Sequence, residues 1–337
     1  RHATLASVAT HLTPFIRKRD ADDLQHHRRA SELSDDEELE KIQDRFVALT
    51  EGFRFIEING LRRLCKNEKI RIQDFCDVVD LYKYGIRENP WKMLDLEQIK
   101  NAKQDFENRV KGQDYAITKT LDVIKRAITG MSGLQGSSHT RPKGILFFAG
   151  PTGTGKTETA KTLAEIIFGD ETYCKCFDMS EYAEKHTVAK LIGAPAGYVG
   201  YEEGGLLTEK VRKHPHAVLL LDEIEKAHPD IFNVLLQVMD YATLSDNQGR
   251  KADFRNIVLI MTSNAGANKV GKSRIGFGSE AINMDALTDA VKQPFQPEFR
   301  NRLSRIVLFR SMDEEMAGKI TQKKLKELSE KMKNKKV

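Results

Sequence analysis

The sequence predicts an α/β protein whose core is a parallel β-sheet flanked by helices. Three observations predict this class. From residue 144 onward, short apolar runs alternate with segments of helical periodicity, a glycine-rich loop follows the first run, and an acidic pair follows a later one. Strands buried on both faces read as continuous apolar runs, and helices cover them. We therefore expect the acidic pair at the carboxyl ends of the strands, where such sheets bind ligands.

The first part of the chain, residues 1–94, is predicted to be entirely helical. Acidic residues that follow Ser34 indicate the start of a helix, and Asn89-Pro90 ends the block. Apolar periodicity continues beyond it, and residues 131–143 are rich in Gly and Ser, as expected of an exposed loop. The helices of residues 1–94 are predicted at about residues 36–49, 55–66 and 72–84. Two more helices are predicted within residues 95–130, on either side of a turn at residues 111–114.

The remaining elements follow in a regular alternation. Each predicted strand is a short apolar run, and each predicted helix carries apolar residues at helical spacing. The predicted strands are residues 144–149, 174–178, 217–221, 256–262 and 305–309, and the predicted helices are residues 156–168, 180–191, 229–240 and 284–293.

The residues between the first strand and its helix form a phosphate-binding motif, G-x-x-x-x-G-K-[ST]. Its glycines allow successive backbone N–H groups to point at phosphate oxygens, and the following helix N-terminus favours anions. Lys156 is placed to reach the β- and γ-phosphates, and the Thr157 hydroxyl to reach Mg²⁺. The motif predicts a nucleoside triphosphate site formed by Gly150, Pro151, Thr152, Gly153, Thr154, Gly155, Lys156 and Thr157.

Two strand ends supply the groups that this chemistry needs. Asp222 and Glu223 follow the apolar run 217–221. In phosphoryl transfer Asp222 would hold Mg²⁺, and Glu223 would orient and deprotonate the attacking water. Asn264 follows the run 256–262, where its amide is expected to hydrogen-bond the γ-phosphate or the water.

Two other segments leave a functional and a structural interpretation open. Arg302, with Arg300 beside it, is a candidate for stabilising transition-state charge on a neighbouring subunit's γ-phosphate, but spacing alone favours a surface salt bridge. Tyr198 and Val199 lie in a glycine-bracketed loop. A ring displayed there fits a gripping role, and a tyrosine packed back on its own loop is the alternative.

Composition narrows the class of protein. The net charge of +5 over 337 residues is small and does not by itself argue for nucleic acid, and no apolar stretch is long enough to cross a bilayer. The four cysteines form no disulfide framework, which indicates a reducing, cytoplasmic location. Cys174 and Cys176 are expected on one face of a strand, as packed thiols rather than as a metal pair.

Residues 108–310 resemble the second ATPase module of Clp-family AAA+ unfoldases, and the resemblance is closest to ClpA. The likeness extends well beyond the phosphate loop and the acidic pair. The matching stretches are residues 177–182, 191–195, 214–229, 235–240 and 249–256.

The resemblance implies a fold, ligands and roles. It implies a ring, expected to be a hexamer, that hydrolyses ATP with Mg²⁺ and threads unfolded or tagged proteins through its pore. Glu223 would be the catalytic base and Asn264 the sensor that follows the fourth strand. Further implied roles are adenine binding by Val110 and Lys111, an arginine finger at Arg302, a pore-loop grip by Tyr198, and a second pore loop within residues 240–251.

One tripeptide bears on the partner of such a ring. Ile275, Gly276 and Phe277 lie in a polar insertion after Asn264, where family members that serve a ClpP-type peptidase carry an apolar tripeptide. Docking to such a peptidase and anchoring within the chain's own domain both stay open. The competing functions are an unfoldase that feeds a peptidase, a protease-independent disaggregase or remodelling chaperone, and a nucleotide-switched assembly scaffold.

The resemblance also predicts the domain organisation. Residues 95–310 would be the large ATPase domain, and residues 311–337 the start of a truncated small helical lid that lacks the sensor 2 arginine. The phrase Leu49-Thr50-Glu51-Gly52-Phe53 resembles the lid of a classical AAA module. Residues 36–90 are therefore interpreted as the lid of an upstream module, with an independent helical domain as the alternative.

Overall fold

The computed structural model describes Thr50 and residues 53–68, 78–79, 81–82, 89–94, 96–129, 141–193, 204–264 and 296–334. The chain divides into two compact units, Arg1–Asn89 and Pro90–Val337. None of the described helices is both long and apolar enough to cross a membrane.

In the first unit, the described residues centre on helix α3 (Phe55–Glu68). This helix confirms the one predicted around residues 55–66. Glu57 stabilises its start, because its carboxylate accepts a hydrogen bond from the backbone N–H of Arg54 at 2.6 Å. Leu61 is fully buried against Val78 and Val79. The helix therefore packs by one apolar side, as its periodicity predicts.

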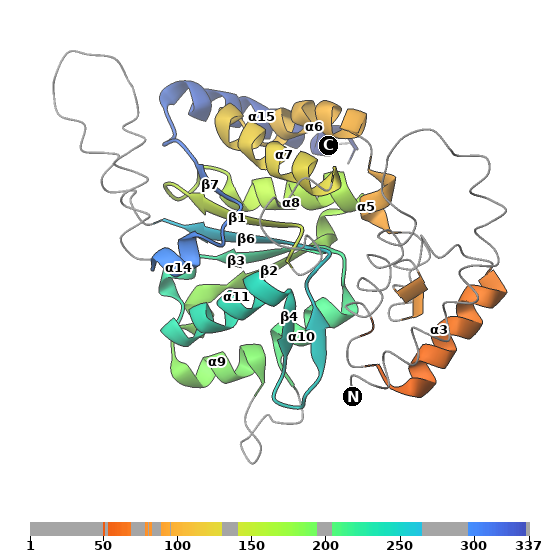
Figure 1. Ribbon diagram of the computed structural model, residues 1–337. Coiled ribbons are helices and arrows are strands. Elements are labelled where there is room, and N and C mark those ends of the chain that lie inside the picture. Colours follow the sequence, from red (N-terminus) through yellow and green to blue (C-terminus); the bar gives the residue numbers. More distant parts are fainter. Residues whose placement is uncertain are drawn as a thin grey trace, which may run out of the picture. The chain divides into compact units, whose positions relative to one another are not determined.

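The second unit is a five-stranded sheet in the order β2-β3-β6-β1-β7. Every pairing in it is parallel, as predicted. Figure 1 shows the strands side by side with helices above and below them. The strands are β1 (Gly144–Ala149), β2 (Cys174–Asp178), β3 (Ala217–Asp222), β6 (Ile257–Ser263) and β7 (Arg305–Leu308).

Two layers of helices cover the sheet (Figure 1). One layer is α6 (Leu96–Arg109), α7 (Asp114–Ile128) and α8 (Lys156–Phe168). The other contains α9 (Lys185–Ile192), α10 (Leu206–Lys213) and α11 (Pro229–Tyr241). A short helix, α5 (Pro90–Met93), precedes α6.

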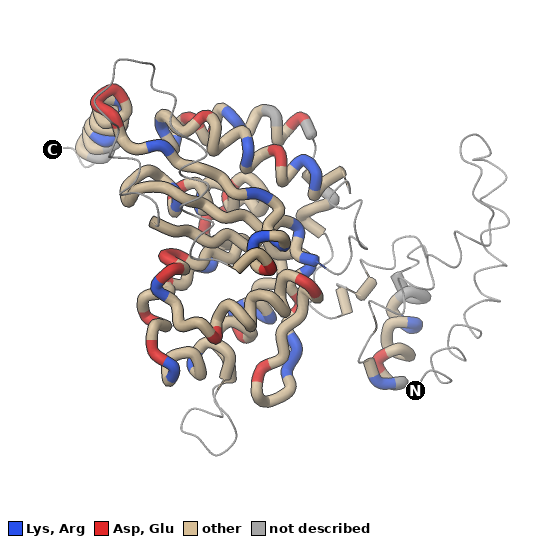
Figure 2. The backbone as a smooth tube through the Cα atoms, turned by 60° about the vertical axis from the view of Figure 1, so that its left-hand side comes forward, with Lys and Arg blue, Asp and Glu red and all other residues tan. Residues whose placement is uncertain are grey.

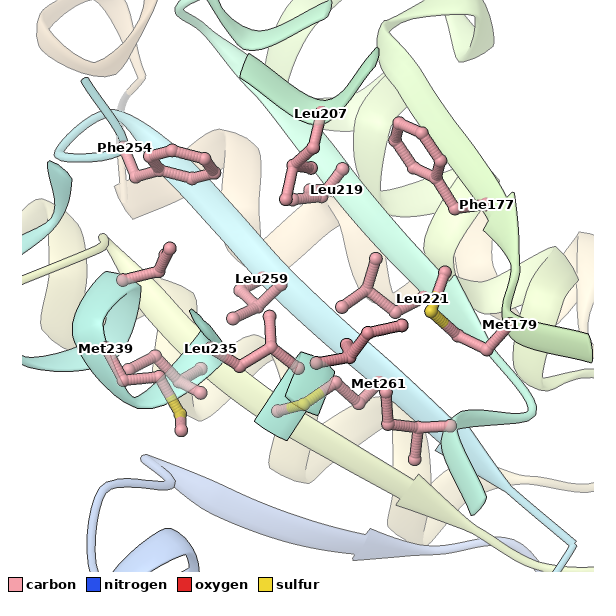
Figure 3. Packing of buried hydrophobic residues seen from close by; sticks show 14 of the residues in the cluster. Phe177, Met179, Leu207, Leu219, Leu221, Leu235, Met239, Phe254, Leu259 and Met261 are labelled. Carbon is pink, nitrogen blue, oxygen red and sulfur yellow. The ribbon is translucent and has the colours of Figure 1, made fainter. Parts of the chain in front are cut away.

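Alternate residues of each central strand pack toward one helix layer or the other. Val218 and Leu220 belong to the cluster beneath α7 and α8, whereas Leu219 and Leu221 belong to the other cluster. Figure 3 shows Leu219 and Leu221 in that second cluster. Because both faces of β3 are buried, its sequence reads as an unbroken apolar run.

Several elements differ from the prediction. Residues 180–191 form a short 3₁₀ turn, η4 (Met179–Tyr182), and then α9, because the Asp178 carboxylate accepts a hydrogen bond from the backbone N–H of Ser180 at 2.9 Å and begins a separate turn. The helix α10 was not predicted, nor was the hairpin of β4 (Thr243–Ser245) and β5 (Lys251–Asp253). The helix predicted at residues 284–293 lies outside the described residues.

The last described element is the 21-residue helix α15 (Glu314–Asn334). It occupies most of the segment assigned to the start of a helical lid. Lysine and arginine are interspersed with aspartate and glutamate along the tube of this unit (Figure 2). This mixture agrees with the small net charge.

Candidate nucleotide-binding site

The phosphate loop begins where β1 ends. Gly150 has a φ of +156°, and a Cβ there would lie 2.5 Å from the carbonyl oxygen of Phe309. Gly155 has a φ of +98° and precedes α8, and its Cβ would lie 3.1 Å from Cγ1 of Val110. Only glycine satisfies both positions, because each needs a positive φ and close approach to a neighbouring element.

Lys156 is buried within this loop, with 7% of its surface exposed. Its ammonium donates hydrogen bonds to the carbonyl oxygens of Gly150 and Pro151, both at 2.7 Å, and to Oδ1 of Asn264 at 2.8 Å. Burial lowers the pKa of Lys156 from its ordinary value, since desolvation disfavours the charged form. A buried cation whose hydrogen-bond partners are neutral oxygens matches an anionic ligand such as a phosphate.

Oxygen atoms that suit Mg²⁺ belong to Thr157, the residue after Lys156, and to Asp222. The Thr157 hydroxyl donates to Oδ2 of Asp222 at 3.2 Å, and the Thr262 hydroxyl donates to the other oxygen, Oδ1. No group of three or more His, Cys, Asp or Glu side chains that could hold a metal occurs among the described residues. One carboxylate and one hydroxyl beside a phosphate loop fit Mg²⁺, which is usually bound by few protein ligands together with water and substrate phosphates.

Glu223 is held in an unusual conformation directly after β3. Its φ of 55° and ψ of 50° lie in the left-handed region, which costs free energy for a residue other than glycine. Its backbone N–H donates to the Thr262 hydroxyl at 3.0 Å. The turn therefore directs the chain sharply away from the strand, and Thr262 ties the acidic pair to β6.

The carboxylate of Glu223 contacts two side chains. Oε1 accepts a hydrogen bond from Nδ2 of Asn264 at 2.8 Å, and Oε2 pairs with the ammonium of Lys226. Asn264 therefore bridges Glu223 and Lys156, which connects the candidate base to the phosphate-binding lysine.

Glu225 completes this network, and sequence reasoning missed it. Its Oε1 accepts a hydrogen bond from the backbone N–H of Asn264 at 2.9 Å, whereas its Oε2 is buried and has no hydrogen-bond partner in the described part of the chain. Thr262 and Lys226 were missed as well. Their only sequence signal is proximity to Asp222, Glu223 and Asn264, and proximity in the chain does not show which side chains turn inward.

The predicted adenine side lies at the turn between α6 and α7. Val110 is 4% exposed and adjoins Gly155 of the phosphate loop. The Gln113 amide donates to the carbonyl oxygen of Arg310 at 2.9 Å, and its oxygen accepts from the Arg310 N–H at 3.0 Å. This pair of bonds fixes the turn that carries Val110 and Lys111 against the segment that follows β7.

Arg302 is placed away from the phosphate loop of its own chain. It precedes β7. Two residues further along, the backbone N–H of Ser304 donates a hydrogen bond to the carbonyl oxygen of Ile145, at the start of β1. The loop follows the opposite, carboxyl end of β1. Arg302 Nε pairs with Asp240 at 2.8 Å, so the surface salt bridge that spacing favoured is present.

The other predicted functional positions lie in the β4–β5 hairpin or outside the described residues. The hairpin of β4 and β5 forms most of the segment 240–251, and the Asp246 carboxylate at its turn pairs with Arg250 at 2.7 Å. Tyr198, Val199, Ile275, Gly276 and Phe277 lie outside the described residues.

A parallel sheet of this strand order, with a phosphate loop after β1 and an acidic pair after β3, defines a P-loop nucleoside triphosphatase. The comparisons with known proteins narrow that class. A family model described as an AAA domain (Cdc48 subfamily) matches residues 141–306.

Individual relatives match a larger share of the chain. The chaperone protein ClpB of Bdellovibrio bacteriovorus is 48% identical over 248 residues, which are 73% of this chain and 28% of that protein. The negative regulator of genetic competence ClpC/MecB of Bacillus subtilis is 42% identical over 275 residues, 80% of this chain and 33% of that protein. A cryo-EM reconstruction of closed-state Hsp104 with ATPγS and FITC casein matches with a TM-score of 0.65 and 36% identity, over 75% of this chain and 43% of that one.

The chain therefore contains an AAA+ domain of the Clp/Hsp100 type. It spans about a third or less of the length of the ClpB and ClpC relatives. A closer likeness to ClpA stays a prediction.

Proposed function

We propose that this chain hydrolyses ATP and, as part of a ring, uses the energy to unfold or remodel other proteins. The observation that carries the proposal is the hydrogen-bonded series Lys156–Asn264–Glu223. It joins a buried phosphate-binding cation to a carboxylate that can accept a proton. The family relationship supports the same reading.

Each residue of the site has a defined task in this proposal. The loop N–H groups and Lys156 bind the β- and γ-phosphates, and Val110 and Lys111 contact the adenine. Thr157 and Asp222 would hold Mg²⁺, which supplies charge neutralisation at the phosphates when bound. The Asn264 amide orients the attacking water beside the γ-phosphate.

Glu223 accepts the proton of that water as its oxygen attacks the γ-phosphorus. Oε2 first has to leave Lys226, and this is inexpensive because the Lys226 side chain is 50% exposed. Exposed ion pairs contribute only about 0.2–1 kcal/mol. Oε1 remains bonded to Asn264, so the base stays aligned while its other oxygen takes the proton.

Arg302 is proposed to act on a neighbouring subunit. Because it lies toward the amino ends of the strands, it is placed away from the loop at their carboxyl ends. A ring of subunits, which we propose to be a hexamer, would bring it to the next subunit's γ-phosphate, where an arginine stabilises transition-state charge.

The substrate class and partners follow from the relatives. The Hsp104 reconstruction was obtained with FITC casein and ATPγS, which supports a polypeptide substrate and an adenine nucleotide here. We propose that Tyr198 and Val199 grip the polypeptide in the pore. We further propose that the ring is cytoplasmic.

The relation to a peptidase separates two forms of the proposal. Similarity to ClpB and Hsp104 favours protease-independent remodelling, and the tripeptide Ile275-Gly276-Phe277 favours delivery to a ClpP-type peptidase. Deletion of Gly276 and Phe277 distinguishes them, because only delivery would lose coupled proteolysis. A nucleotide-switched scaffold would not depend on a pore loop, so Tyr198→Ala would leave its activity unchanged.

The variant Glu223→Gln tests the catalytic assignment. It keeps the hydrogen bond from Asn264 but loses the proton acceptor, so we expect ATP hydrolysis to fall by about 10²–10⁴-fold while ATP binding persists. Phosphate release and fluorescent-nucleotide binding measure the two effects. Glu181→Gln, at an exposed glutamate outside the site, is the matched control and should retain turnover. Turnover at the normal rate in Glu223→Gln would remove Glu223 as the base.

A further inference from the structure

Two thiols lie together on the edge strand β2, outside the nucleotide site. Sγ of Cys174 and Sγ of Cys176 are 3.7 Å apart. The two residues are separated by one position, so both side chains lie on the same face of the strand. Cys174 is half-buried and Cys176 is exposed, which corrects the expectation of two packed thiols. The reason is that, among the described strands, β2 lies at the edge of the sheet and pairs with β3 alone.

The surroundings of this thiol pair favour a thiolate. The pKa of the Cys176 thiol is lowered to about 7, chiefly by a hydrogen bond from Cys174. The charges of Lys161 on α8 and Lys210 on α10 act in the same direction, whereas burial and Asp222 oppose them. The same hydrogen bond and burial raise the pKa of Cys174. Reactive and metal-binding cysteines occur in such electropositive, partly exposed settings.

The sulfur separation distinguishes an ion from a disulfide. Two thiolates bound to one tetrahedral Zn²⁺ at about 2.3 Å have their sulfurs about 3.8 Å apart. A disulfide would need the sulfurs to close to about 2 Å across Cα atoms roughly 6.6 Å apart, at the upper limit of disulfide geometry. The pair as it stands therefore fits a shared ion without movement of the strand.

We propose that Cys174 and Cys176 form a two-thiolate site for a thiophilic d¹⁰ divalent cation such as Zn²⁺ or Cd²⁺. On binding, the ion replaces the S–H protons, which are released to solvent, and no oxidant or reductant is needed. Among the described residues, no cluster of three or more His, Cys, Asp or Glu side chains includes the pair. Water or a small ligand would complete the coordination, so the ion would be exchangeable. This site does not depend on ATP hydrolysis, and its test is independent of that function.

Cadmium titration of the reduced full-length chain tests the proposal. Thiolate-to-cadmium charge transfer in the ultraviolet reports binding, and excess Mg²⁺ occupies the oxygen ligands of the nucleotide site. The reference protein is Cys65→Ser/Cys76→Ser, in which the thiol pair is the only source of sulfur ligands from cysteine. We expect one Cd²⁺ per chain in the reference, displaced by Zn²⁺.

Single substitutions in the reference protein locate the site. Cys176→Ser, Cys174→Ser and Cys174→Ala should each weaken Cd²⁺ binding roughly tenfold or more, because each removes one of two ligands. Circular dichroism and the melting temperature confirm folding, and the exposed position of Cys176 makes its serine variant the decisive one. Unchanged affinity in Cys176→Ser, absence of the band in the reference, or one Cd²⁺ per two chains would each overturn the proposal.

Discussion

At the scale of single residues, Asn264 organises the candidate site. Its side chain contacts both Lys156 and Glu223, and its backbone N–H donates to Glu225. Three charged groups, one at the start of α8 and two in the segment after β3, therefore depend on the position of one residue. Displacement of this residue would misalign the base relative to the bound phosphate.

Glu225 should act as a positioning residue. Glu225→Ala removes the acceptor for the Asn264 N–H, so we expect kcat to fall by about tenfold with KM changed less than about twofold, because the loss concerns alignment rather than ATP binding. Glu225→Gln keeps an acceptor oxygen and should restore most of kcat. Steady-state ATPase kinetics measure both. A change in KM alone, or failure of the glutamine variant to recover, would contradict this role.

At the scale of elements, the close contact between the phosphate loop and β7 needs glycine at position 150. Gly150→Ala would place a Cβ 2.5 Å from the Phe309 carbonyl oxygen, so β1 and β7 would have to separate. Gly153 also has a positive φ, of +78°, but a Cβ there would meet no atom of the described residues within 4 Å. Gly153→Ala therefore measures the cost of the backbone conformation alone.

We expect the two alanine variants to differ clearly in stability. Gly153→Ala should lower the free energy of unfolding by about 1–2 kcal/mol, from strain at positive φ. Gly150→Ala should lower it by about 3 kcal/mol or more, since the steric clash adds to the strain. Urea denaturation at equal protein concentration measures the difference. Equal losses would show that the contact with Phe309 relaxes without cost.

Sequence patterns were sufficient for the elements of the sheet. The runs at β1, β3 and β6 are so uniformly apolar that strand identity follows from the residues alone, and the loop motif identifies the ligand class. The helix α10 and the β4–β5 hairpin were not predictable in the same way. Both are short, and their apolar residues Leu207, Leu244 and Ala252 become buried only because distant elements cover them.

At the scale of the whole molecule, His216 should make stability sensitive to acid. It is 3% exposed, and neither ring nitrogen has a hydrogen-bond partner among the described residues. Burial lowers its pKa from 6.5 to about 4, with Lys143 acting in the same direction and Asp253 against it. The folded state therefore rejects a proton that the unfolded state accepts below about pH 6.5.

As the pH falls from 6.5 to about 4, His216 should lower the free energy of unfolding by up to about 3 kcal/mol. Above pH 6.5 it is neutral in both states and the effect vanishes. In His216→Leu the loss between these pH values should be smaller by that amount, as measured by denaturation at a series of pH values. His186→Leu, at an exposed histidine, should keep the wild-type slope. Parallel curves for His216→Leu and wild type would exclude this source of acid sensitivity.

Assembly can be tested through Arg302. Arg302→Ala should reduce ATPase by about a thousandfold or more if the arginine completes a neighbour's site. Mixed with Glu223→Gln at equal ratio, it should regain activity at about a quarter of the interfaces, where an intact base meets an intact arginine. Asp240→Asn breaks the same ion pair but keeps Arg302, and should stay active. Two inactive variants that remain inactive when mixed would show that Arg302 does not act between subunits.

By itself, the sequence determined the class of fold and ligand, because strand burial, helical period and the phosphate loop are local patterns. Only the tertiary structure decided which side chains meet. Thr262, Glu225 and Lys226 join the site through the order of strands β1, β3 and β6, Arg302 lies at the other end of the sheet, and Cys176 is exposed because β2 is an edge. These outcomes depend on contacts between residues far apart in the chain, and no spacing within a single segment encodes them.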